Sequence, residues 1–179
     1  MDVFQLSPNH LWKAAPGCRI LVMDNGGVRC DIPQEWIVYS PRRHVFVFDR
    51  FPPATRCLIA ISCKRVPHEA MAIPLRDILD GWVAAEDRPV VERGEPVRFR
   101  RWPLEAAWIE LRIASQEGGV KAARVCAARA DGTQALIVCD SHLEEEPGIA
   151  KVWKILIDTL VVGDYIADPI TGAKRMRRG

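Results

Sequence analysis

Residues 149–162 constrain the fold most, because their apolar side chains recur at helical spacing and form one broad face. A face of this kind must be buried against another element. It consists of Ile149, Val152, Trp153, Leu156, Ile157 and Leu160. Residues 74–85 carry a second stripe of the same period, with Pro74 early in the first turn, where proline is well tolerated. The sequence therefore predicts two amphipathic helices that pack on a sheet.

The remaining apolar segments follow the two-residue period of β-strands. An opening hairpin is predicted because Asn25-Gly26 suits a tight turn with positive φ. In residues 45–48 both faces are apolar, which is typical of a sheet covered on both sides. The predicted strands lie at 18–23, 28–32, 44–49 and 56–66, followed by a three-stranded antiparallel meander at 107–113, 120–130 and 134–140.

These elements predict the α+β class, as a three-layer α/β/α sandwich with a mainly antiparallel twisted sheet. A chain of 179 residues suits one domain. We therefore expect residues 1–179 to form a single domain with a short N-terminal extension and a basic C-terminal tail at 174–178. Residues 87–103, which are rich in proline and arginine, are expected to form a long surface connection with a short edge strand at 97–101.

Charge and cysteine content restrict the compartment and the partners. The formal charge of +2 is too small to indicate a nucleic acid or an anionic membrane surface. The apolar runs are shorter than the roughly 18 residues needed to cross a bilayer, and residues 1–8 lack the pattern of a secretory signal. The six cysteines lie in apolar or alternating segments, as reduced thiols do. We expect a cytoplasmic protein that neither enters a membrane nor binds nucleic acid.

The order of the elements carries a resemblance to a known family. A hairpin leads into Ile32-Pro33-Gln34-Glu35-Trp36, and strand pairs around Phe46 and Ile59 precede a helix, a meander and the closing segment 152–160. Over roughly residues 18 to 162 the chain resembles the PsbP-like fold family. That family includes plant photosystem II extrinsic proteins, a Ran-binding nuclear import factor and small bacterial proteins.

The resemblance implies an antiparallel sheet between helices that docks another protein rather than performing catalysis. Some bacterial members of the family are chaperones that shield apolar helices of secreted effectors. No binding motif of any branch matches this sequence residue by residue, so the resemblance implies a fold and a binding role but no site.

Two groups of residues could carry chemistry. Cys63 and His68 with Cys139 and His142 offer thiolates and imidazoles, but ligand pairs in structural zinc sites are usually two to four residues apart on turns. The run at 139–142 combines a thiol, a carboxylate, a hydroxyl and an imidazole, yet neighbours in a strand point to opposite faces. We therefore expect no metal, no cofactor and no catalytic residue.

Tryptophan and arginine dominate the binding energy of protein interfaces. On this ground Arg100, Trp102 and Trp108 are the interface candidates. Trp108 lies on the strand face opposite Ile109, so either a helix covers that face or Trp108 contributes to an exposed surface.

The predicted function is that of a non-enzymatic protein-binding or adaptor module, with a chaperone-like role as one form of it. A sheet face, or the connection at 87–103, would dock a protein partner, and the oligomeric state stays open. The alternative is a small enzyme or ligand-binding protein with a pocket near Cys139 and His142.

Overall fold

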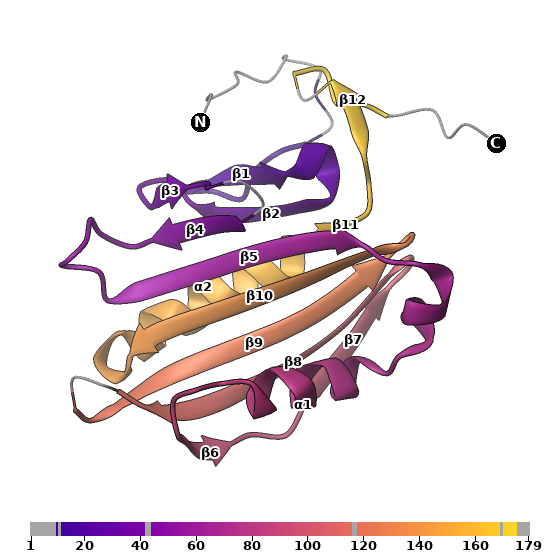
Figure 1. Ribbon diagram of the computed structural model, residues 1–179. Coiled ribbons are helices and arrows are strands. Elements are labelled where there is room, and N and C mark those ends of the chain that lie inside the picture. Colours follow the sequence, from indigo (N-terminus) through magenta and orange to yellow (C-terminus); the bar gives the residue numbers. More distant parts are fainter. Residues whose placement is uncertain (1–9, 11, 42–43, 116–117, 169, 175–179) are drawn as a thin grey trace.

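The computed structural model describes residues 10, 12–41, 44–115, 118–168 and 170–174. Within these ranges, antiparallel sheets and the helices α1 (Leu75–Ala84) and α2 (Glu146–Thr159) make an α+β fold (Figure 1). The predicted class and the mainly antiparallel sheet are thus confirmed. Most of the predicted N-terminal extension, and the basic tail after Lys174, lie outside the described residues.

The largest sheet has eight strands in the order β3-β4-β5-β10-β9-β8-β6, and β7 pairs with β8 as well. The strands are β3 (Ile37–Tyr39), β4 (His44–Phe48), β5 (Cys57–Arg65), β6 (Val90–Arg93), β7 (Val97–Arg101), β8 (Leu104–Ala114), β9 (Val120–Ala130) and β10 (Thr133–His142). The predicted meander is confirmed, since β8, β9 and β10 pair antiparallel in this order. The segment predicted as a long connection contains two strands rather than one. The expected strand at 97–101 is β7, and β6 precedes it.

The two strands share one edge of the long β8. Strand β7 pairs with the first half of β8, where Val97 lies opposite Trp108, and β6 pairs with the second half, where Val90 lies opposite Ile113. Between them the Gly94 N–H donates to the carbonyl of Glu110. The sequence did not reveal β6, because its pairing depends on a partner roughly 20 residues away rather than on its own alternation.

A second sheet joins the two ends of the chain. The predicted hairpin forms β1 (Cys18–Met23) and β2 (Val28–Pro33), and β11 (Val161–Val162) pairs with β2; β12 (Ile166–Asp168) and β13 (Ala173–Lys174) form a separate pair. The closing helix was predicted to reach Val162 but ends at Thr159. The reason is tertiary, because Leu160 is extended and Val161 and Val162 bond to β2.

Short 3-10 turns connect some of these elements: η1 (Asp24–Gly26), η2 (His68–Ala72) and η3 (Leu143–Glu145). The hairpin turn has the predicted positive φ, at Asn25 and at Gly26. A Cβ at Gly26 would lie 2.3 Å from the carbonyl oxygen of Asp164, so only glycine fits there. No helix within the described part of the chain combines the length and the apolarity that crossing a membrane requires.

The alternation along β8, β9 and β10 divides the buried apolar side chains into two clusters. Leu79 of α1 belongs to one cluster, with Ile109 and Val125 of the sheet. Trp153 and Leu156 of α2 belong to the other, with neighbouring residues of the same strands and with β2. Both predicted helical stripes therefore pack against the sheet, although in α1 only Leu79 is fully buried.

An arginine of β7 caps the end of α2. The Arg101 guanidinium donates from Nη2 to the carbonyl of Ile157 at 2.5 Å and to that of Leu160 at 3.1 Å, and from Nη1 to the carbonyl of Asp158. The last carbonyls of a helix have no partner inside the helix, and a cation there also favours the macrodipole. Arg101 thus ties the edge of the sheet to the end of α2.

We predict that Arg101→Ala lowers the free energy of unfolding by about 1–2 kcal/mol, because several helix-end carbonyls lose their donor. Urea denaturation followed by circular dichroism measures the change. Arg98→Ala, which removes another exposed arginine from the same strand, is the control and should change stability by less than about 0.5 kcal/mol. Equal losses in the two variants would contradict the capping role.

Candidate functional site

The structure brings two of the three predicted interface residues together. Trp102 lies in the turn between β7 and β8 and is 84% exposed. The Arg100 guanidinium lies 5.5 Å from the centre of the Trp102 ring, in cation–π geometry, and 3.3 Å from a carboxylate oxygen of Glu105. Arginine and tryptophan thus form an exposed pair at the end of a hairpin.

Trp108 lies on the other face of the sheet. Arg100 pairs with Glu105, whereas Trp108 is three residues further along β8 and therefore points to the opposite side. Its ring packs edge to face on that of Trp153, with the ring centres 5.7 Å apart. Helix α2 therefore partly covers this face, and Trp108 is not part of the same surface as Arg100 and Trp102.

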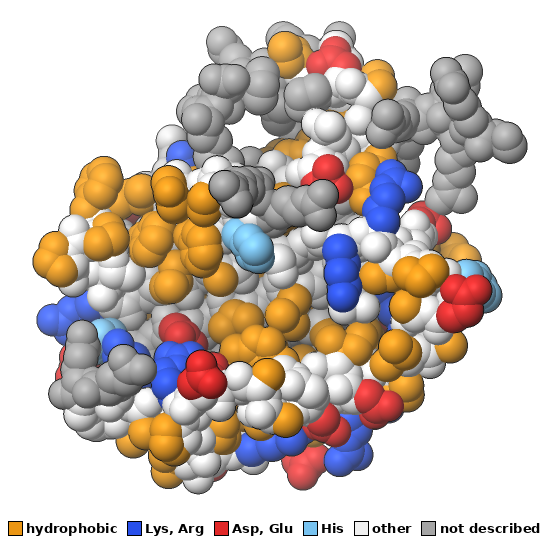
Figure 2. Space-filling view, in the orientation of Figure 1, with side chains coloured by type: hydrophobic (Ala, Val, Ile, Leu, Met, Phe, Trp, Pro, Cys, Tyr) orange, Lys and Arg blue, Asp and Glu red, His pale blue; other side chains and the backbone are white. Residues whose placement is uncertain are grey.

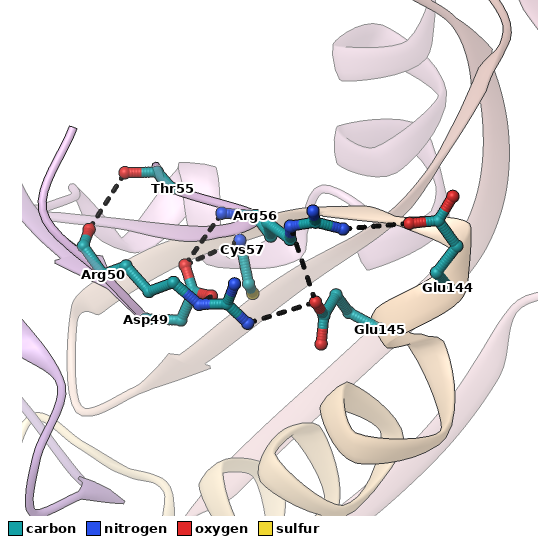
Figure 3. Close-up of polar contacts among 7 residues, drawn as sticks. All are labelled: Asp49, Arg50, Thr55, Arg56, Cys57, Glu144 and Glu145. Carbon is teal, nitrogen blue, oxygen red and sulfur yellow. Dashed lines mark hydrogen bonds and ion pairs between the residues drawn. The ribbon is translucent and has the colours of Figure 1, made fainter. Parts of the chain in front are cut away.

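A polar pocket of about 580 Å³ lies beside His142. It is lined by Arg50, Pro53, Ala54, Thr55, Arg56, Lys121, His142 and Glu144. Figure 3 shows how its charges pair: Arg56 donates to Glu144 at 3.0 Å, Arg50 donates to Glu145 at 3.1 Å, and Asp49 accepts the backbone N–H of Arg56. These contacts tie the β4–β5 turn to the segment before α2.

Cys139 does not line this pocket. Its side chain is buried in the cluster under α2, and its sulfur lies 3.7 Å from that of Cys57. The hydrogen bond to Cys139, together with burial, raises the pKa of the Cys57 thiol, so this thiol stays protonated and is a poor nucleophile. The alternative prediction placed one pocket near both Cys139 and His142. In the structure the pocket lies beside His142, whereas Cys139 is buried in the core.

The four residues that were weighed as zinc ligands, and not expected to bind zinc, are not gathered either. Cys63 lies opposite Ala135, and Cys139 lies opposite Ile59, so four strand positions, or about 13 Å, separate the two thiols along the sheet. Among the described residues, no group of three or more His, Cys, Asp or Glu side chains is arranged to hold a metal ion. All six cysteines are free thiols.

The surface that the sequence did not reveal is a partly exposed apolar sheet face. Strand register places Tyr39, Phe46, Ala60 and Val138 in one row across four strands. We call this surface the open face; it consists of Ile37, Tyr39, Phe46, Phe48, Leu58, Ala60, Leu136 and Val138. Tyr39 is 59% exposed, and the others are partly buried.

Helix α1 lies on the same side of the sheet and packs on β8 and β9, and Leu136 and Val138 of the open face pack partly against the same cluster. In Figure 2, orange side chains gather over the β3–β4 region and line the hollow between that region and α1. Among the described residues, no helix covers the side that carries Phe46 and Phe48, so the expected cover of both sides at residues 45–48 is not confirmed there. An apolar pattern indicates that a strand is suited to burial on both faces. It does not show whether the same chain or another molecule packs on each face.

An ion-paired arginine links the segment after α1 to β10. Arg88 follows α1 and donates to Glu86 from Nε at 2.7 Å and to Asp140 of β10 from Nη1 at 2.8 Å. The hydrogen bond from Arg88 holds the pKa of Glu86 below its usual value, and the two carboxylates raise the pKa of Arg88. The end of α1 is thereby attached to the sheet.

We predict a loss of stability below about pH 4.5 that depends on Glu86. Its pKa is lower in the folded state, so its contribution is complete above the ordinary value of 4.5 and is lost as the pH falls through the folded value. Glu86→Gln should lower the free energy of unfolding by about 1 kcal/mol at pH 7 and by less at pH ~3.5. Urea titrations at both pH values measure this difference, with the exposed Glu95→Gln as control. A deficit of the same size at both pH values would contradict the linkage.

Comparison with known proteins identifies relatives by sequence. A family model described as Alr1449 matches residues 19–166. The uncharacterized protein alr1449 of Nostoc sp. is 32% identical over 175 residues, which cover 96% of this chain and 91% of that protein.

Solved structures share the fold. The cyanobacterial PsbP (CyanoP) of Synechocystis sp. PCC 6803 matches with a TM-score of 0.62 and 11% identity, over 85% of this chain and 98% of that chain. LpqN of Mycobacterium tuberculosis, involved in cell envelope biogenesis, matches with a TM-score of 0.58 and 10% identity, over 80% of this chain and 89% of that chain. At such identities the likeness concerns the fold alone. It confirms the PsbP-like fold that the order of the elements predicted.

Proposed function

The chain belongs to the Alr1449 family and has the PsbP-like fold, and from this starting point we propose that it is a non-enzymatic binding module. Its ligand is an apolar helical segment of another protein, and the binding surface is the open face. The observation that carries the proposal is the row of partly exposed apolar side chains across β3, β4, β5 and β10. Contiguous exposed apolar surface of this kind marks interaction sites.

The size of the open face suits one helix. Neighbouring strands are about 4.8 Å apart, so β3 and β10, separated by three spacings, are about 14 Å apart. An α-helix with its side chains is about 10–12 Å wide. A partner helix laid between β3 and α1 would bury the apolar row as α1 itself buries the neighbouring part of the sheet. With α2 on the other side, the complex would have the layers of a three-layer α/β/α sandwich.

The amino acids of the open face also suit an apolar helix. Aromatic rings of Tyr39, Phe46 and Phe48 offer large contact areas, and the rings of Phe46 and Phe48 stack with their centres 6.5 Å apart. Ala60 lies between Phe46 and Val138 in the same row, and its side chain is much smaller than theirs. Ridges of leucine or valine side chains on a helix pack closely against small residues of this kind. A module with this surface would shield the helix from water, which is a chaperone-like role in the cytoplasm.

Arg100 and Trp102 form a second part of the proposed interface. Arg100 lies on the same side of the sheet as α1 and the open face, because its partner Glu105 alternates with Ala106 and Leu104 of the other cluster. The exposed Trp102 ring, with a cation beside it, is a typical interface anchor. Trp108 stays a weaker candidate, since α2 partly covers it.

The polar pocket beside His142 gives the alternative, an enzyme or ligand-binding protein, less support because the arginines at its rim are paired with carboxylates.

Site-specific photocrosslinking tests the open face. A benzoylphenylalanine in place of Ala60 should form adducts in cells with an apolar, helix-forming segment of a different protein, which mass spectrometry of the digested adduct identifies. The matched control carries the same group in place of Lys151, on the exposed side of α2. Adducts that form equally from both positions, or none from position 60, would contradict the proposal.

The roles of the two tryptophans differ, and a partner identified in this way separates them. Trp102→Ala should weaken the partner's binding by about tenfold, as loss of an anchor does, and leave the free energy of unfolding within about 0.5 kcal/mol of wild type. Trp108→Ala should cost about 2–3 kcal/mol of stability, because it removes packing against Trp153. Calorimetric titration and urea denaturation of both variants give these values. An unchanged affinity for Trp102→Ala would exclude the hairpin end from the interface.

A further inference from the structure

Strand β7 has one free edge. It pairs with β8 on one side, and no strand of the described residues pairs with its other side. Four of its five residues are exposed. The free edge of a strand presents backbone N–H and C=O groups, onto which an extended segment of another chain can add as a further strand. Strand β7 is therefore open to strand addition.

The side of β7 that faces α2 is apolar along its first residues. Val97 and Phe99 alternate with the arginines of the strand and point to this side, where both line a groove of about 480 Å³ between the sheet and α2. Val97 is 46% exposed, and Phe99 is partly buried. Trp108 and Ile157 line the groove further in. Apolar side chains of an added strand would lie beside Val97 and Phe99 and would remove their exposed surface from water.

The other side of β7 is cationic. Arg98 and Arg100 point away from α2, and the strand itself contains no acidic residue. Arg100 forms an ion pair with Glu105, whereas Arg98 is exposed and has no ion-pair partner among the described residues. Opposite charges at facing positions of neighbouring strands stabilise a sheet, and like charges destabilise it. A second copy of β7 would place arginine beside arginine, so the charge of this edge favours a partner with carboxylates.

We propose that the free edge of β7 binds, by strand addition, an extended segment of another protein in which acidic residues alternate with apolar ones. Backbone hydrogen bonds hold the segment along β7, its apolar side chains contact Val97 and Phe99, and its carboxylates lie beside Arg98. The inference goes beyond the proposed function, because β7 lies at the opposite margin of the main sheet from the strands of the open face.

Titration of the isotope-labelled protein with a peptide, followed by nuclear magnetic resonance, tests the proposal. The probe is an octapeptide that alternates glutamate with valine and is blocked at both ends, added up to about 1 mM. We expect saturable shifts of the backbone amides of residues 97–101. A control peptide of the same composition, with four glutamates followed by four valines, should bind at least about tenfold more weakly, because its side chains cannot sort to the two sides. Absence of saturable shifts at these residues, or equal binding of the two peptides, would overturn the proposal.

Methylation of the peptide nitrogens separates strand addition from contact through side chains alone. Successive residues of an extended chain direct their N–H groups to opposite edges. Methyl groups on the four valine nitrogens therefore block one edge of the probe, and methyl groups on the four glutamate nitrogens block the other. Only the edge that pairs with β7 is needed, so one methylated peptide should lose binding and the other should keep it. The same effect from both would contradict backbone pairing.

A charge reversal tests the role of Arg98 at an exposed position. Arg98→Glu should weaken binding of the glutamate peptide by about fivefold, since a favourable pair across the strands becomes a like-charge pair. The same variant should bind a peptide that alternates lysine with valine more tightly than the wild type does. Lys151→Glu, an equal change of charge on the exposed side of α2, is the control and should alter neither affinity. Unchanged affinities of Arg98→Glu for both peptides would exclude this side of β7 from the site.

Discussion

The antiparallel ladder of β8, β9 and β10 is the constraint on which the rest of this structure depends. These strands are 11, 11 and 10 residues long, and their alternation sends one set of apolar side chains to α1 and the other to α2. Many of the inward residues of β9 are alanines, which let helices approach the sheet closely. A shift of one residue in the register of one of these strands would move its apolar side chains to the opposite faces of the sheet.

Much of the fold could be predicted from the sequence because it follows from local periods. The stripe around Leu79 and that around Leu156 indicated helices, and the alternation around Ile109 indicated a strand. The errors concern long-range contacts: the last turn of the closing helix was lost to pairing of Val161 and Val162 with β2. The expected cover of Phe46 and Phe48 is not confirmed among the described residues, since apolar character does not reveal what lies opposite a side chain.

The candidate sites could be predicted less well. Arg100 and Trp102 are close in sequence and therefore close in space, whereas Trp108 was grouped with them although it points to the other face. Arg124 of β9 is 5% exposed and forms ion pairs with Glu110 and Glu146, which belong to two other elements. Nothing in the sequence around Arg124 indicates that it is buried.

The short strands at both margins of the main sheet have a consequence for solubility. One margin ends in β3, of three residues, and the other is divided between β6 and β7, which carry several arginines. Long, flat, uncharged borders recruit further chains into cross-β stacks, whereas short and charged ones do not. Among the described residues, the edges of the main sheet are therefore short or carry arginine, which disfavours growth of fibrils along them. The proposed partner could then bind the open face without this sheet assembling edge to edge.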